Sequence, residues 1–115
     1  MQFLLLIYAD EHVILNTPEQ TTRERIAEYA AFTESLRKSG VLVASNRLRP
    51  TGTARTVRGS RNAPKVVDGP FAETKEQLGG FYLIDVNDRE AALAWAARCP
   101  GAAHGSVEVR PVWTA

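Results

Sequence analysis

The sequence predicts an α+β fold: a ferredoxin-like β-α-β-β-α-β order with one hairpin inserted in its middle. Two observations carry this prediction. Short β-prone runs alternate with two segments of helical character, and turn-forming residues interrupt the middle of the chain. With 115 residues, 44% of them hydrophobic, residues 1–115 are expected to form a single domain.

The first part of the chain is predicted to form a strand, a long helix and a second strand. The run 2–9 is β-prone and apolar on both alternating faces, as in a central strand covered on both sides. Thr17 is expected to cap a helix that has Pro18 at its first position and Gln20 completing a capping box. The helix should end near Gly40, before a strand at 41–48. Its apolar stripe is predicted to comprise Ile26, Tyr29, Ala30, Thr33 and Leu36.

The second part is predicted to form a hairpin, a strand, a helix and a last strand. The hairpin pairs 53–58 with 65–68 around a turn at 59–64. A strand at 79–86 follows, again apolar on both faces, and then a helix at 89–98. Asp88 is expected to cap that helix, and Pro100-Gly101 to stop it. The last strand spans 106–113, where a proline favours the edge of a sheet or the end of a strand.

Three of the predicted strands need cover on both faces, and this need predicts how the chain assembles. Two helices on one side of an antiparallel sheet cover only one of its faces, yet the runs LLLI, VLV and FYLI are apolar on both. The simplest cover for the second face is another copy of the chain. We therefore expect a homodimer in which two sheets meet face to face as an α/β barrel, with a cleft between the sheets or between sheet and hairpin.

The charges are balanced overall but unevenly spread. Lys and Arg number 14 and Asp and Glu 13, so net charge does not indicate nucleic acid. Between Glu34 and Asp68 there is no acid, and no aromatic residue is present there to stack on bases. This segment is either a solvated hairpin or a surface that attracts an anionic partner. Its cations are Arg37, Lys38, Arg47, Arg49, Arg55, Arg58, Arg61 and Lys65.

Several classes of protein have no support in the sequence. The single cysteine, Cys99, offers neither an internal disulfide nor a second thiol for a metal. The apolar run at the N-terminus is too short for a signal or membrane segment, so the expected location is cytoplasmic. No phosphate-binding glycine loop, Cys/His metal spacing or serine nucleophile elbow occurs. No metal, cofactor, membrane or nucleic acid is therefore expected.

The stretch 68–80, DGPFAETKEQLGG, is the most informative part of the sequence. It places carboxylates, a hydroxyl, an ammonium and an amide within one short loop. Asp68 or Glu73 is predicted to be a general base, with Asp68 preferred, and Lys75 to stabilise developing negative charge. The alternative is a capped turn with no catalytic role. The tripeptide 10–12 is interpreted as a solvated connection, with Asp10 as the exception, and His104 as an exposed or turn-stabilising residue.

The run DGPFAETKEQLGGFYLIDV, with ALAWAARCP and GSVEVRPV after it, resembles the DGPF-type members of the YCII-related protein family. The segments MQFLLLIYADE and LRKSGVLV fit the same family, so the resemblance spans nearly the whole chain. It implies a dimeric α/β barrel of ferredoxin-like subunits. It also implies an association with extracytoplasmic-function sigma factors, and in some relatives a histidine–aspartate pair in the barrel cleft.

One position departs from the histidine-bearing relatives. Counted from Gly40, their helical histidine corresponds to Tyr29 in this sequence. A tyrosine can donate a hydrogen bond or bind an oxyanion, but with an unperturbed pKa of roughly 10 it is a poor base at neutral pH. The resemblance therefore supports a binding cleft more strongly than it supports catalysis.

Two functions follow as hypotheses. The first is a dimeric barrel that binds a small organic molecule, with acid–base chemistry at Asp68. The second is a non-catalytic regulatory module that contacts a protein, for example a sigma factor, through its cationic segment at 37–65. The residues expected to bind the ligand in the first hypothesis are Asp10, Tyr29, Arg47, Phe71 and Lys75.

Overall fold

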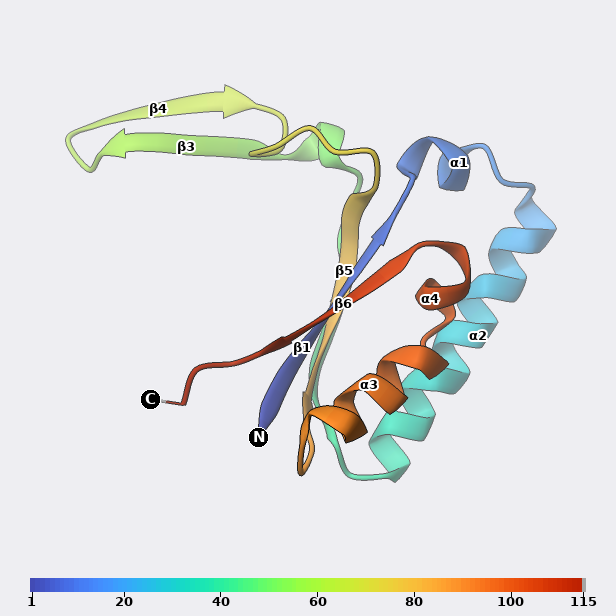
Figure 1. Cartoon of the computed structure of the whole chain (residues 1–115). Helices are drawn as coiled ribbons and strands as arrows, with labels where there is room; N and C mark the ends of the chain where they lie inside the picture. The colour runs from blue at the N-terminus through green and yellow to red at the C-terminus, as the bar shows by residue number, and fades with distance from the viewer. Residues whose placement is uncertain (115) are drawn as a thin grey trace.

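The computed structural model describes residues 1–114 and contains a four-stranded antiparallel sheet (Figure 1). β1 lies in the interior of this sheet, paired with β5 on one side and β6 on the other, as its apolar residues predict. The edge strand β6 ends at Pro111, earlier than predicted. In spatial order the strands are β2 (Leu42–Arg47), β5 (Gln77–Asp85), β1 (Gln2–Ala9) and β6 (Ser106–Pro111).

Two long helices, α2 (Glu19–Lys38) and α3 (Arg89–Arg98), lie on the same side of the sheet (Figure 1). Asp88 caps α3 as predicted, and its carboxylate accepts a hydrogen bond from the amide of Ala91. The chain extends 46 × 44 × 19 Å. The shortest dimension matches one sheet and one layer of helices, each about 10 Å thick. The mixed α+β class predicted from the sequence is thus confirmed.

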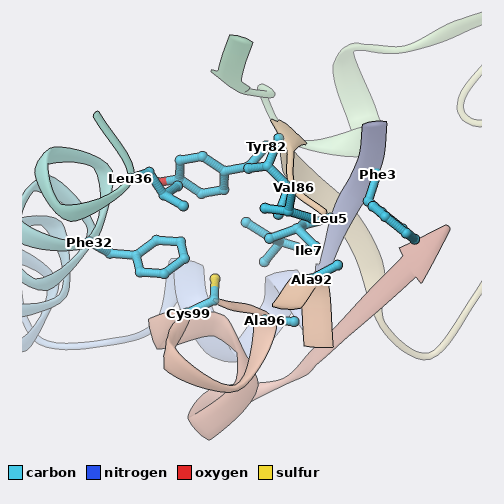
Figure 2. Close-up of a cluster of buried hydrophobic side chains, with 11 residues drawn as sticks. Phe3, Leu5, Ile7, Phe32, Leu36, Tyr82, Val86, Ala92, Ala96 and Cys99 are labelled. Atoms are coloured by element: carbon cyan, nitrogen blue, oxygen red, sulfur yellow. The ribbon is translucent and has the colours of Figure 1, made fainter. Parts of the chain in front are cut away.

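The core fills the space between the sheet and the two long helices (Figure 2). Phe32 of α2 meets Tyr82 of β5 edge to face, with 5.2 Å between ring centroids. The Tyr82 hydroxyl lies 2.7 Å from Thr33 Oγ1, which itself donates to the Tyr29 carbonyl, so Tyr82 is the donor of the pair. The side chains that are most completely buried are Phe3, Leu5, Leu36, Ile84 and Cys99.

The other face of the sheet is not covered by the long helices. Along β1, buried residues alternate with half-buried ones, and β5 shows the same alternation from Gly80 to Ile84. Because successive side chains of a strand point to opposite faces, the half-buried residues lie on the face opposite the core, α2 and α3. We call this surface the open face; its large side chains are Leu4, Leu6, Tyr8, Phe81 and Leu83.

Three details of the predicted helices are wrong. The long helix buries Phe32 and Leu36, whereas Ile26 is 51% exposed, because the helix meets the sheet mainly through its second half. Thr17 forms no capping box: its hydroxyl donates to the Val13 carbonyl, and Pro18 precedes the first turn without a side-chain cap. Two short helices were also missed, α1 (Glu11–Leu15) and α4 (Pro100–His104).

The inserted hairpin consists of β3 (Arg55–Ser60) and β4 (Ala63–Asp68) and forms a separate two-stranded sheet. A short 3₁₀ helix, η1 (Thr51–Thr53), leads into it. The turn is shorter than predicted, because Ser60 already pairs with Ala63. The hairpin projects from one end of the main sheet, on the side away from α2 and α3 (Figure 1). Among residues 1–114 no helix is long and apolar enough to cross a bilayer.

Gly105 provides a test of how tightly α4 joins the sheet. A Cβ at this position would lie 2.2 Å from the backbone carbonyl oxygen of Tyr8, which cannot move aside as a flexible side chain would. We expect Gly105→Ala to lower the free energy of unfolding by roughly 1–3 kcal/mol, as overpacking does. The matched control is Gly52→Ala, where a Cβ meets nothing within 4 Å. Urea titrations showing equal stability for the two variants would contradict this packing.

Candidate functional site

The Asp68–Gly80 stretch leaves the hairpin through a turn that is fixed to the start of β3. The Gly69 amide donates to the Ala54 carbonyl at 2.8 Å, and the Thr56 hydroxyl donates to the Gly69 carbonyl at 2.9 Å. Gly69 has φ +97°, a left-handed conformation that side chains disfavour. The glycine of the DGPF sequence is therefore required by the backbone of this turn.

A groove of about 330 Å³ lies where this loop passes over η1 at the end of the main sheet. Its volume is close to the lower limit of small-molecule pockets, about 300 Å³. Threonine hydroxyls, a carboxylate and an amide supply its polar groups. The groove is lined by Thr51, Gly52, Pro70, Ala72, Glu73, Thr74 and Gln77.

Glu11 holds the parts of this groove together. Its two carboxylate oxygens accept hydrogen bonds from the amide and the hydroxyl of Thr51, both at 2.7 Å. The Glu11 amide donates to Gln77 Oε1, and Gln77 Nε2 donates to the Thr74 carbonyl. The interpretation of residues 10–12 as a solvated connection is wrong for Glu11. The unrecognised signal was Asp10, which caps α1 and so turns Glu11 toward η1.

Asp68 lies at the root of the hairpin and is exposed. Its carboxylate pairs with Arg55 Nε at 2.9 Å, and 89% of its side chain is accessible to solvent. Phe71 is also exposed, with the Arg58 guanidinium 5.1 Å from its ring centroid. Lys75 is exposed in the loop before β5. Within a single copy, the DGPF residues thus form a surface rather than an enclosed pocket.

Tyr29 lies on the opposite side of the main sheet, among the helices. A Cβ at Gly101 would lie 2.7 Å from Tyr29 Oη, so the hydroxyl packs against the backbone of α4. Burial raises the pKa of Tyr29 to about 12, with further contributions from Cys99 and Tyr82, while Arg25 and Arg47 act to lower it. At neutral pH this hydroxyl keeps its proton and can donate a hydrogen bond, but it cannot act as a base.

The predicted ligand-binding residues are therefore distributed over separate places. Arg47 is exposed and stands opposite Gly80 in the register, on the same face as the helices, near Tyr29. Asp10 Oδ1 accepts the amides of His12 and Val13 at 3.0 and 3.4 Å, which gives it a capping role. Asp68 instead is the last residue of β4 and pairs with Arg55.

β6 forms a polar border on the open face, which was not predicted from the sequence. Glu108 accepts a hydrogen bond from the Tyr8 hydroxyl at 3.4 Å and pairs with Arg110, whose pKa it raises. Ser106 donates to Glu76 Oε1 at 2.7 Å. These residues oppose β1 residues of the open face in the register. The alternation in SVEVRP was the available signal, since Val107 and Val109 face the core.

Two further features bear on the choice of site. A hollow of about 360 Å³ between α2 and the α3–α4 connection is lined by Phe32, Arg98 and four other residues, away from the DGPF loop.

The part of the chain from 1 to 114 contains no group of three or more His, Cys, Asp or Glu arranged to hold a metal ion. The groove beside the DGPF loop is therefore the better candidate.

Known proteins resemble this chain over its whole length. The family described as the YCII-related domain matches residues 1–115. A Rhizobium meliloti (strain 1021) protein described as uncharacterized is 40% identical over 114 residues, covering 97% of this chain and 92% of that protein. A solved structure of 5-chloro-2-hydroxyhydroquinone dehydrochlorinase from Burkholderia phenoliruptrix AC1100, in complex with 2,5-dihydroxybenzoquinone, is 14% identical. It shares the fold with a TM-score of 0.56, over 99% of this chain and 94% of that one.

The raised pKa of Tyr29 predicts how stability responds to alkali. The pKa of Tyr29 is about 12 in the folded chain and 10.0 in the unfolded chain. The difference contributes to the stability of the fold in full below pH 10, and this contribution is lost as the pH rises from 10 to 12. The pKa values of Tyr82 and Cys99 are also raised, so they act in the same direction. We expect Tyr29→Phe to unfold at higher pH than the wild type when followed by circular dichroism. Identical alkaline transitions would contradict burial of this hydroxyl.

Proposed function

Because the chain belongs to the YCII-related family, and because one face of its sheet is apolar and uncovered by its long helices, we propose that it works as a dimer that binds a small organic molecule. The subunit in this proposal is ferredoxin-like, and two subunits pair their open faces as an α/β barrel. The ligand lies in the groove beside the DGPF loop. The open face is the observation on which the proposal depends.

The energetic reason for pairing is the apolar area on this face. Leu4, Leu6, Phe81 and Leu83 form its central part on β1 and β5. Completing the burial of one such side chain is worth up to about 1.5–3 kcal/mol, and symmetry doubles each contribution. Glu108 and Arg110 lie along one border, where a polar rim is usual in interfaces.

The groove supports a small ligand rather than a macromolecule. It offers hydroxyl, carboxylate and amide groups within about 330 Å³, a combination that orients a compact polar compound. The dehydrochlorinase that shares this fold binds 2,5-dihydroxybenzoquinone. Small hydroxylated ring compounds are therefore the first probes to use with this chain.

Asp68 has a defined role in the proposal. In one copy its carboxylate is exposed and paired with Arg55. Once a second copy covers this surface, Asp68 is the general base of the proposed site. Phe71 and Lys75 then contact the ligand from the same loop.

Association with a sigma factor stays a prediction. The surface it would use is the cationic hairpin, whose exposure in the structure favours contact with another macromolecule. Its two strands carry Arg55, Arg58 and Lys65, with Arg61 at the turn.

The dimer can be tested by placing a charge on the open face. We expect Leu6→Asp and Leu83→Asp each to raise the dimer dissociation constant by about 100-fold or more, since each buries two charges without partners. The matched control is Leu93→Asp on α3, where leucine is already 48% exposed. Light scattering measures the mass, and circular dichroism checks folding. Dimers that persist in both folded variants would rule out pairing through this face.

Ligand binding can be tested by thermal shift. We expect 2,5-dihydroxybenzoquinone, or another compound from a panel of hydroxylated rings, to raise Tm in a concentration-dependent way. Asp68→Asn should reduce the shift at least threefold at equal ligand concentration, whereas Asn62→Asp at the hairpin turn should leave it unchanged. A wild-type dimer stabilised by no compound in the panel would contradict small-molecule binding.

A further inference from the structure

The β3–β4 hairpin stands apart from the rest of its own chain. It forms a separate two-stranded sheet and projects beyond the main sheet, on the side away from α2 and α3 (Figure 1). Val57 and Val66 are 63% and 62% exposed. A two-stranded hairpin is marginally stable in water unless one of its faces packs against something. The valines therefore indicate a contact that one copy does not supply.

The two faces of the hairpin differ. The register places Val57 opposite Val66 and Gly59 opposite Pro64, on one face with the Arg55–Asp68 pair. The other face carries Arg58 over the Phe71 ring and the half-buried Thr56, so the DGPF loop partly covers it. We call the uncovered face the arm face; its residues are Arg55, Val57, Gly59, Pro64, Val66 and Asp68.

The position of the hairpin indicates what the arm face meets. The hairpin leaves the main sheet on the side of the open face, away from α2 and α3 (Figure 1). The only cation on the arm face, Arg55, is paired with Asp68, and the remaining exposed side chains include Val57 and Val66. The contact that the arm face lacks is therefore mainly apolar.

We propose that the β3–β4 hairpin is an intersubunit arm, whose arm face packs on the body of a second copy of this chain. This inference rests on the dimer proposed above. A copy docked on the open face lies on the side toward which the hairpin projects (Figure 1). The valines supply the apolar contact.

The arm would also connect the dimer to the candidate site. Gly69, at the start of the DGPF loop, is hydrogen-bonded to Ala54 and Thr56 at the root of the hairpin. Any displacement of the hairpin therefore moves the loop that lines the groove. Docking of the arm fixes this loop, so each groove depends on the partner subunit for its shape.

Cross-linking tests the contact directly. Asn62→Cys, at the exposed turn of the hairpin, is labelled with a maleimide photo-cross-linker in an equal mixture of ¹⁴N and ¹⁵N protein. Cys99 is 2% exposed, and burial raises the pKa of its thiol, so labelling is selective for position 62. We expect cross-linked peptides that combine the two isotopes and join position 62 to the body of another copy. Cross-links confined to one isotope would overturn the proposal.

Paired variants separate the arm from the dimer. Val57→Thr with Val66→Thr keeps β-branched residues but removes the apolar arm face, and should weaken dimerisation about tenfold. Val67→Thr, on the other face, is the control. In one outcome, Leu6→Asp breaks the dimer while the double valine variant leaves the dimer dissociation constant unchanged. That result would rule out the arm contact and leave the proposed dimer supported. If the wild type is monomeric, both proposals fail. A cross-link formed in cell extract only to a different protein also overturns the arm.

Discussion

The structure depends on one constraint: a sheet has two faces, and the long helices of this chain cover only one. α2 and α3 bury Phe3, Leu5 and Ile84 on their side. The alternation of β1 and β5 leaves leucines and two aromatic residues on the other side. Uncovered apolar surface of this kind marks an interaction site in a soluble protein. The proposed dimer, its cleft and the proposed role of the hairpin all depend on how that face is covered.

The groove depends on an element that has little to do with the core. α1 contains five residues and buries none of them completely. Through Glu11 it nevertheless holds η1, Gln77 and, through Gln77, the loop at Thr74. The polar half of the DGPF stretch is thus supported by side chains rather than by packing. Such a site can change its shape when a ligand or a partner subunit contacts it.

Much of the fold could be predicted from the sequence because the signals are local. The alternating apolar runs, the Asp88 cap and the glycine that ends α2 each act within a few residues. The misplaced stripe on α2 has another cause. Which side of a helix is buried is decided by the sheet it meets, and Phe32 is buried because Tyr82 and Trp95 stand opposite it.

The candidate site was harder to predict, because its residues come together through the tertiary structure. The DGPF stretch could be singled out by its chemistry, and its family was predicted correctly. The separation of Tyr29 and Arg47 from Asp68 could not be foreseen, because it depends on the hairpin projecting to the side opposite α2 (Figure 1). Glu11 and Glu108 were missed because each contacts a partner that is distant in sequence, and Arg110 was missed because it pairs with Glu108.

Sedimentation equilibrium of the unmodified chain at micromolar concentration tests the central claim most directly. The subunit has a mass of 12.6 kDa. If a second copy covers the open face, the measured mass is twice the subunit mass and remains so on dilution through the micromolar range. A chain that sediments at its subunit mass under these conditions would show that the open face is exposed in solution, and would contradict the account.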